Sequence, residues 1–455
     1  MKKVFTGLIL LMVLTALPLC YPLAEAENVA LNIYGKGGAG EWDNPLLAEK
    51  YPYITWQGND WGDFSTIIQS LGKDSPDVFG IAFANNHFEA VISKGYSYDL
   101  AAYEEISEAV NAMHPFIQKA VKKGDAVLGV PTQLTCSNWA YSKKAFAAAE
   151  IPNERIPATY ADLLDFLFWW VEEGAYAYPD VRIIRGTTDI RQALIEKITF
   201  DLIDICWYRE EMMDFSSPEI SEIFKKLDTL DFDKENEFLS HLKEGDIYDY
   251  HVLFDLRFDW LDFPAYADAE EMTPLPLKIS ANDKLLAPVD MRLFFLSPSS
   301  AYPNEAAFYV QSYLQSRDDV FRTIAYNTPH EPILNARVAE ELAILQQELG
   351  VIEASLIGCS ETDKEGYENQ REIKLRIIES LQKYKWEVSK DAISAYESLV
   401  PYLFIRKYSP LGGIENDSYS EIKMLIDRYS QKQISAGNFL LQLQKKIDAI
   451  LREQV

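Results

Sequence analysis

Residues 75–83 read SPDVFGIAF, and this short stretch decides the class of fold. The turn-forming residues Ser75, Pro76 and Asp77 lead directly into the apolar run 78–83. A run that is apolar on both faces and bounded by a turn is typical of a strand in a parallel sheet covered on both sides. The stretch therefore predicts a buried strand, and helices should lie on either side of it.

The segments around this strand alternate between the two kinds of secondary structure. Residues 29–34 (VALNIY) alternate as a strand does, and Phe64, Ile67, Ile68 and Leu71 have helical spacing. Residues 100–123 are predicted to be helical, and 127–130 (VLGV) form another strand. With the strand at 78–83 in its place between the two helical segments, the order strand, helix, strand, helix indicates an α/β layer fold.

The second half of the chain is richer in helix. Thr159 can cap the helix that follows it, with Asp162 at the third position of a capping box. The other elements expected here are an extended stretch at 132–141, a helical and aromatic-rich region at 190–265, a strand at 286–296, a helix at 304–314 and an almost entirely helical region at 336–455, whose last helix begins near Ser435.

Length and charge limit the classes of protein to which the chain can belong. A single hydrophobic core stops growing at about 250–300 residues. The chain has 455 residues, so two lobes are expected. The formal net charge of −27 repels nucleic acids and anionic membrane surfaces. The excess of acidic over basic residues would also suit a cationic ligand.

The N-terminus has the pattern of an export signal. Lys2 and Lys3 precede the apolar stretch 4–19, and small residues end at Ala26. This pattern predicts a signal peptide over residues 1–26 that is cleaved after Ala26 and an extracytoplasmic location. Lipidation at Cys20 is the alternative, although Leu19 is larger than the residue that lipoprotein cleavage sites prefer before the cysteine.

The order of segments resembles the extracellular solute-binding proteins of ABC importers, family 1, which contains maltose- and oligosaccharide-binding proteins. The similar stretches are spread over most of the mature chain, and each is weak by itself. They are LNIYGKGG at 31–38, SPDVF at 75–79, FEAVISKGYSYDL at 88–100, LGVP at 128–131, NWAYSKKAF at 138–146, IPATYADLL at 156–164, the strand and helix at 293–314, and the closing segment 429–451, in which QKQ at 431–433 replaces the usual glycine.

The resemblance implies a two-lobed periplasmic-binding-protein type II fold of the α/β class, with the ligand cleft between the lobes and a helix-rich C-terminal region. Lobe 1 would comprise 27–134 plus 285–330, and lobe 2 would comprise 135–284 plus 331–455. The chain would first cross between lobes near 134–141, return near 284–289 and leave lobe 1 again after about residue 327. Closure on the ligand would be a hinge motion.

The resemblance also places candidate ligand-binding residues on segments that face the cleft. Each has a structural alternative: an aromatic ring is more often core, paired asparagines favour turns, and Asp255 with Arg257 could be a surface ion pair. The candidates are Trp42, Asn85, Asn86 and His87 in lobe 1, Thr135, Ser137 and Trp139 on the crossing strand, and Trp207, Tyr208, Asp255, Arg257 and Trp260 in lobe 2.

Two other motifs do not match the sequence patterns of the sites that they resemble. The glycine-rich loop 35–40 lacks the spacing of a phosphate-binding loop, and the acidic run that starts at Asp231 lacks the glycine and the final carboxylate of a calcium loop. Cys136, Cys206 and Cys359 are an odd number, so at most one disulfide can form, and we favour buried free thiols. We expect no catalytic residue, no metal and no cofactor.

The sequence therefore predicts a binding protein rather than an enzyme. The leading hypothesis is a monomeric solute-binding protein that delivers a small solute, by analogy a carbohydrate, to the membrane permease of an ABC importer. The alternatives are a secreted carbohydrate-active enzyme and a surface sensor module built on the same fold. Stoichiometric binding without turnover would distinguish the binding protein from the enzyme.

Overall fold

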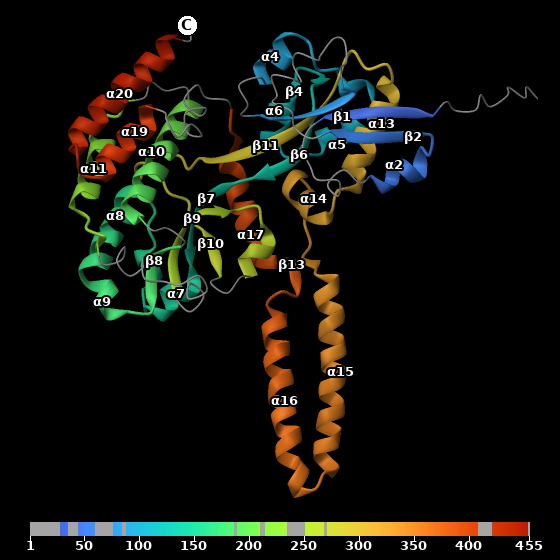
Figure 1. The fold of residues 1–455 in the computed structure, drawn as a ribbon, viewed down its shortest axis with the longest axis vertical. Coiled ribbons are helices and arrows are strands. Elements are labelled where there is room, and N and C mark those ends of the chain that lie inside the picture. The colour runs from blue at the N-terminus through green and yellow to red at the C-terminus, as the bar shows by residue number, and fades with distance from the viewer. Residues whose placement is uncertain are drawn as a thin grey trace, which may run out of the picture.

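The structure is a computed structural model, and it describes residues 28–34, 44–59, 76–83, 88–185, 189–209, 214–233, 251–267, 271–407 and 421–453. Figure 1 shows two bodies side by side and a long helical hairpin that projects away from them. The predicted signal segment, the glycine-rich loop 35–40 and the helix at 63–71 lie outside the described residues.

The first body is built on a six-stranded mixed sheet in the order β14-β11-β3-β1-β2, with β6 also paired to β11. The strand predicted from the opening stretch is β3; it is parallel to β1 and antiparallel to β11. Its first four residues are buried, as the apolar run predicts, but the sheet is not purely parallel. The strands are β1 (Val29–Tyr34), β2 (Ile54–Asn59), β3 (Val78–Ala82), β6 (Val130–Thr135), β11 (Ala287–Leu296) and β14 (Leu403–Ile405).

Asp77 explains why an acidic residue precedes β3. Its carboxylate accepts a hydrogen bond from the backbone N–H of Asn32 on β1 at 2.8 Å and another from the hydroxyl of Ser300. The side chain is buried, and a buried carboxylate needs such donors to replace water. Asp77 therefore joins β1 to the segment after β11 and has a structural role.

In the described part of the chain, seven helices surround the first sheet. The long helix α13 begins at a proline, which suits the first turn because its missing N–H would have no partner there. These helices are α2 (Pro45–Lys50), α4 (Phe88–Ser93), α5 (Glu104–Asn111), α6 (Pro115–Val121), α13 (Pro303–Ser316), α14 (Asp319–Ala325) and α17 (Lys390–Leu399).

The second body has a four-stranded sheet in the order β10-β7-β9-β8. The predicted capping box is confirmed, because Thr159 and Asp162 bond each other's backbone N–H at the start of α8. The elements are β7 (Ser137–Ser142), β8 (Val181–Ile184), β9 (His251–Asp259), β10 (Met272–Pro274), α7 (Lys143–Ala148), α8 (Tyr160–Trp169), α9 (Ala175–Ala177), α10 (Ile190–Arg209), α11 (Pro218–Thr229), α19 (Glu421–Ser430) and α20 (Ala436–Glu453).

The prediction that 190–265 is helical is wrong for β9. From Phe254 to Asp259 the residues FDLRFD alternate between apolar and charged, which is the period of a strand with one wet face. The neighbouring apolar run at 252–254 hides this alternation.

Two separate hydrophobic cores confirm the expected division into two bodies. The first includes Leu31 and Phe295, and the second includes Leu163 and Phe439. The chain crosses at Cys136, between β6 and β7, which agrees with the predicted first crossing. Two boundaries need correction. Val388, Tyr396 and Leu403 pack in the first core, although 331–455 is expected in lobe 2. Phe258, Trp260 and Phe263 also pack in the first core, although 135–284 is expected in lobe 2.

The hairpin consists of α15 (Ala336–Gly358) and α16 (Glu361–Gln382). It has a small cluster of its own, formed by Leu342, Leu345 and Ile378. At its base β12 (Ile333–Leu334) pairs with β13 (Trp386–Val388), so the chain returns to the first body where it left. The remaining short elements are β4 (Lys122–Lys123), β5 (Ala126–Val127), η1 (Leu100–Ala102), η2 (Asn153–Arg155), η3 (Trp170–Gly174), η5 (Phe263–Ala267) and η6 (Val400–Tyr402).

Cys136, Cys206 and Cys359 are free thiols, as favoured from the sequence; the first two are buried and Cys359 is half-buried. Within the described residues, every helix is too short or too polar to span a bilayer.

Candidate ligand-binding site

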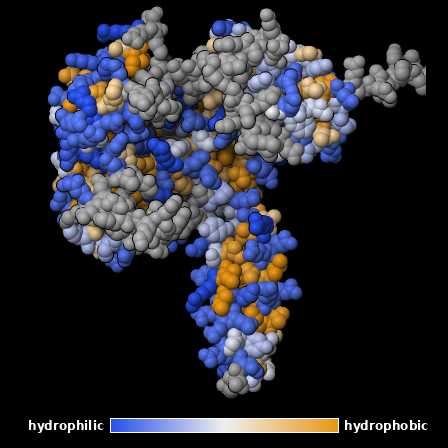
Figure 2. All heavy atoms as spheres, in the orientation of Figure 1, coloured by the Kyte–Doolittle hydropathy of each residue, from blue (hydrophilic) through white to orange (hydrophobic). Residues whose placement is uncertain are grey.

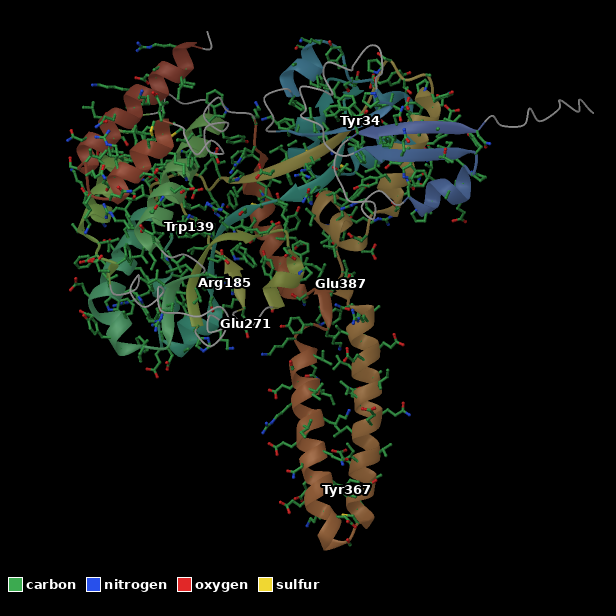
Figure 3. All side chains as sticks on the ribbon, in the orientation of Figure 1. Tyr34, Trp139, Arg185, Glu271, Tyr367 and Glu387 are labelled. Carbon is green, nitrogen blue, oxygen red and sulfur yellow. The ribbon has the colours of Figure 1, made fainter. Side chains whose placement is uncertain are left out.

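The candidate site begins at the edge of the first sheet where β1, β3 and β6 end. The register fixes this edge, because Arg292 on β11 lies opposite Ala82 on β3, and Asp290 lies opposite Thr135 on β6. In Figure 3, Tyr34 marks the end of β1. Ligands of open α/β sheets bind beyond the carboxyl ends of parallel strands, so this edge is the expected ligand-binding part of the first body.

Four predicted site residues fall in the loops that follow these strands. Trp42 comes after β1, and Asn85, Asn86 and His87 come after β3; all four lie outside the described residues. Thr135 is described: it is half-buried and ends β6 at the same edge.

The crossing from the first body to the second is held by a carboxylate. The backbone N–H of Cys136 donates to Oδ1 of Asp259 at 2.7 Å, and the N–H of Leu261 donates to the same oxygen at 3.0 Å. Burial raises the pKa of Asp259, and these two backbone donors oppose that shift. Burial also raises the pKa of the Cys136 thiol, so this thiol is neutral and unreactive near pH 7.

Trp139 and Trp260 do not present their rings to a cleft. Each is 1% exposed, and both indole N–H groups have partners. The Trp139 indole donates to Asp201 at 3.0 Å, and the Trp260 indole donates to the backbone oxygen of Trp139 at 2.8 Å. Figure 3 shows Trp139 inside the second body. The expectation that these two residues bind the ligand is therefore corrected: both tryptophans are core residues.

Asp201 organises a polar network under the surface of the second body. Its Oδ2 accepts hydrogen bonds from Trp139 and, at 2.8 Å, from the hydroxyl of Tyr160. Its Oδ1 binds the Lys197 ammonium at 2.5 Å. Burial and the nearby Asp201 carboxylate raise the pKa of Tyr160 well above its ordinary value, so this hydroxyl stays protonated and donates. Lys197 also lies 3.4 Å from the side-chain oxygen of Asn138.

Strand β9 presents a charged face next to this network. Because side chains alternate along a strand, Asp255 and Arg257 lie on one side, opposite the buried Phe254 and Phe258. Arg257 is exposed, and its guanidinium is 3.8 Å from Glu196 on α10. Asp255 accepts a hydrogen bond from the backbone N–H of Arg257 and lies 3.9 Å from Arg185.

Ser137 extends this face to the crossing. Its hydroxyl donates to the backbone oxygen of Arg257 at 3.2 Å, and its side chain is exposed. We define the second-body rim as Ser137, Asn138, Glu196, Lys197 and Arg257. The rim offers a hydroxyl, an amide, a carboxylate and two cations within one surface, beside the point where the chain enters from the first body.

The C-terminal end of α10 touches the first body directly. The ring of Tyr208 stacks on Phe404 of β14 with centroids 3.7 Å apart. The Arg406 guanidinium is 2.8 Å from Asp204 on α10 and 3.6 Å from Asp290 on β11. Tyr208 therefore bridges the two bodies, while Trp207, one residue earlier, is half-buried against the second core.

Sequence reasoning missed Asn138, Lys197, Asp204 and Arg406. The sequence does offer a signal for Lys197, Asp201 and Asp204, because they recur at helical spacing among apolar residues of α10, and buried charges need partners. Arg406 gave no such signal, since its carboxylate partners are remote in sequence.

Two hollows within the described residues lie away from this rim. One of about 320 Å³ is lined by residues of α5, α13 and α14, including Glu105 and Arg322. Another of about 420 Å³ lies at the base of the hairpin, beside Ala339 and Gln382. In the described residues, no group of three or more acidic, histidine or cysteine side chains is arranged to hold a metal.

Comparisons with known proteins support the two-body architecture. No protein-family model and no curated protein matches the sequence. Among solved structures, an ABC substrate-binding protein from Listeria monocytogenes in complex with cycloalternan matches with a TM-score of 0.55 at 13% identity, covering 93% of this chain and 99% of its own.

Two further solved structures give the same result. The cyclic alpha-maltosyl-1,6-maltose binding protein from Arthrobacter globiformis has a TM-score of 0.55 at 11% identity, covering 93% of this chain and 99% of its own. The sugar-binding protein MalE from Xanthomonas citri has a TM-score of 0.54 at 14% identity, covering 94% and 98%. This chain thus has the two-lobed α/β fold of family 1 solute-binding proteins.

Proposed function

We propose that this chain is an exported solute-binding protein that captures a small solute, of the carbohydrate class, between its two bodies and delivers it to the membrane permease of an ABC importer. The observation that carries the proposal is the pair of independent cores joined at Cys136, with the carboxyl edge of the first sheet and the second-body rim at the same crossing. The similar structures named above are binding proteins for sugars.

The chemistry of the rim suits a ligand rich in hydroxyl groups. Each sugar hydroxyl can both donate and accept, and side-chain amides, carboxylates and guanidinium groups offer planar partners in fixed directions. Ser137, Asn138, Glu196 and Arg257 provide such groups at the crossing. Thr135 and the loops with Trp42, Asn85, Asn86 and His87 would supply the side of the site that belongs to the first body.

The protein holds this solute without transforming it. We propose that the polar groups of the rim orient hydroxyls and that closure of the two bodies removes water around them. The charged groups of the rim already have partners: Arg257 pairs with Glu196, and Lys197 pairs with the underlying Asp201. A sugar hydroxyl can therefore join an existing network instead of meeting isolated charges.

A titration of the purified mature chain with mono- and oligosaccharides tests the proposal. We expect saturable binding of one solute per chain and recovery of that solute unchanged. Arg257→Ala should weaken binding by removing an exposed cation of the rim, whereas Arg376→Ala should not, because Arg376 pairs with Glu372 on the remote hairpin. Equal affinity in both variants would remove Arg257 from the site.

Export has its own test. We propose that residues 1–26 are removed, so the secreted chain should begin at Glu27. A chain recovered with a lipidated Cys20 at its N-terminus would instead show the anchored form.

A further inference from the structure

Strand β11 divides its side chains between the first core and the opposite side of the sheet. Ala287, Val289 and Met291 pack in the first core. Since successive side chains of a strand point to opposite sides, Asp290 and Arg292 lie on the other side. Asp290 is half-buried and Arg292 is exposed. An exposed arginine therefore stands in the interior of the first sheet, on a strand with neighbours on both edges.

The contacts of Asp290 show that this side of β11 faces the second body. Its carboxylate is 3.6 Å from the guanidinium of Arg406, and the same guanidinium is 2.8 Å from Asp204 on α10. Arg292 lies two residues, or about 6.7 Å, further along the same side of the strand. Its side chain is therefore on the side of the sheet that meets α10.

Strand β14 supports this orientation independently. It is parallel to β11, with Phe404 opposite Pro288. The residues before and after Phe404 pack in the first core, whereas Phe404 itself stacks on Tyr208 of α10. Pro288 and Arg292 are four residues apart on one strand and so share a side. The side of the sheet that carries Arg292 is thus the side that contacts the second body.

Arg292 also lies at the carboxyl edge where a ligand is expected. It is opposite Ala82, the last residue of β3, and opposite Gln133 of β6. Opposed residues of paired strands lie on one face of the sheet, so Gln133 is beside Arg292 and Thr135 is beside Asp290. Gln133 is exposed and Thr135 is half-buried. We call Gln133, Thr135, Asp290 and Arg292 the first-body face.

Within the described residues, the Arg292 guanidinium has no carboxylate partner and makes no hydrogen bond. Other cations at the crossing differ from it, because each has a carboxylate within ion-pair distance. These pairs are Arg406 with Asp204, Lys197 with Asp201, and Arg257 with Glu196. Arg292 is thus a cation of the crossing whose charge the described part of the chain does not balance.

Closure of the two bodies would remove water from Arg292. A charge that loses its water is stable only where it is paired and hydrogen-bonded. The carboxylates of α10 and β9, the second-body elements at the crossing, already have partners. They are Glu196, Asp201, Asp204 and Asp255, which pair with cations, and Asp259, which accepts two backbone N–H groups. This arrangement favours a counter-charge that the solute itself brings.

We propose that the solute is an acidic sugar and that Arg292 binds its carboxylate between the two bodies. This inference rests on the proposed function and narrows the carbohydrate class to sugars of the uronic acid type. The planar guanidinium can donate two parallel N–H groups to the two oxygens of a carboxylate. Gln133 and Thr135 lie on the same face and can bond the hydroxyl groups next to that carboxylate.

The net charge of the chain makes an unpaired cation significant. At −27, the protein as a whole repels an anionic solute. Binding of such a solute therefore needs a local positive group that no carboxylate of the protein neutralises. Arg292 meets this requirement, whereas a neutral sugar would need only hydrogen-bonding groups, which the second-body rim already provides.

Calorimetric titration of the mature chain with matched ligand pairs tests the inference. The probes are di- and trisaccharides of galacturonic, glucuronic and mannuronic acid, each paired with its methyl ester, which keeps the ring and removes the charge. We expect at least one free acid to bind about tenfold or more tightly than its ester, as a charge-assisted bond requires. Sugars that bind with no preference for the free acid would overturn the inference and leave the proposed function standing. No binding of any sugar would contradict both.

Variants of Arg292 connect the preference to this residue. Arg292→Gln removes the charge, so the ratio of acid to ester affinity should fall about tenfold, while Arg292→Lys keeps the charge and should retain part of the preference. The control Arg337→Gln removes the same charge from an exposed position near the start of α15, on the hairpin that projects from the two bodies (Figure 2), and should leave the ratio unchanged. Because Arg292 is exposed, thermal unfolding of its variants should match that of the natural chain. A preference for the acid that persists in Arg292→Gln would contradict the assignment.

Discussion

The guanidinium of Arg406 meets the carboxylate of Asp204 at 2.8 Å, and this contact joins the two bodies. Arg406 follows β14 of the first sheet, and Asp204 lies on α10 of the second body. Tyr208, one turn further along α10, stacks on Phe404, so an ion pair and a ring stack act at the same place. Because these contacts lie between the two bodies, a change in the angle between the bodies would alter them.

Arg406→Ala should therefore destabilise the relative placement of the bodies. Both side chains of the pair are less than one third exposed, and removal of one partner leaves the other without its counter-charge. We expect a loss of about 1–3 kcal/mol in the free energy of unfolding, measured by urea denaturation. Arg376→Ala is the matched control on an exposed pair and should change stability by less than about 1 kcal/mol. Equal losses would mean that the Arg406 contact has no special weight.

Trp139→Ala should lower the free energy of unfolding, whatever its effect on ligand binding. The side chain is fully enclosed and shares Asp201 with Tyr160, so its removal leaves a cavity and an incompletely bonded carboxylate. A loss of about 3–5 kcal/mol is expected from large-to-small replacement of a buried aromatic, and thermal unfolding measures it. A variant of unchanged stability that had lost only its affinity for solute would restore Trp139 to the binding site.

His114 should make stability depend on pH. Burial, and next the neighbouring His330, lower the pKa of His114 to about 4, whereas an unfolded histidine titrates near pH 6.5. Between about pH 4 and pH 6.5, the unfolded chain therefore binds a proton at this histidine, whereas the folded chain does not. Stability is complete above about pH 6.5 and falls as the pH drops toward 4, by an amount on the order of 2 kcal/mol.

The variant His114→Phe tests this dependence. It retains a ring of similar size but cannot titrate, so its unfolding midpoint should fall less between pH 7 and pH 5 than that of the natural chain. Identical falls in the two proteins would assign the acid sensitivity to other groups.

Thr159→Ala should weaken α8 by removing the capping box that the sequence predicted. The Thr159 hydroxyl accepts the N–H of Asp162 at 3.1 Å, and without it this donor loses its partner. We expect about 1 kcal/mol, measured as a shift in the denaturation midpoint. Thr159→Ser keeps the hydroxyl and should retain most of the stability.

Local signals explain what was predicted correctly. The apolar run at 78–83, the Thr159 cap and the periodicity of the last helix each depend on neighbouring residues, and the structure confirms β3, α8 and α20. The crossing at Cys136 was placed by resemblance. The predictions of β3, α8 and α20, in contrast, need only residues that are near one another in sequence.

The errors come from contacts between distant residues. β14 and α17 return to the first core after the whole hairpin has intervened, and no local pattern marks which core a short apolar strand will join. Trp139 and Trp260 are expected at the cleft only because the resemblance places their segments there, although an aromatic ring is more often a core residue. Their burial depends on Asp201 and on the crossing, which only the three-dimensional structure brings together.

The central claim is that two hinged bodies bind one small solute, and calorimetric titration of the mature chain with a panel of oligosaccharides tests it most directly. We predict a saturable heat of binding at one site per chain for at least one sugar, with a reduced affinity in Arg257→Ala and the sugar intact afterwards. A folded chain that gives no heat with any member of the panel, or one that releases cleaved sugar, would contradict this account.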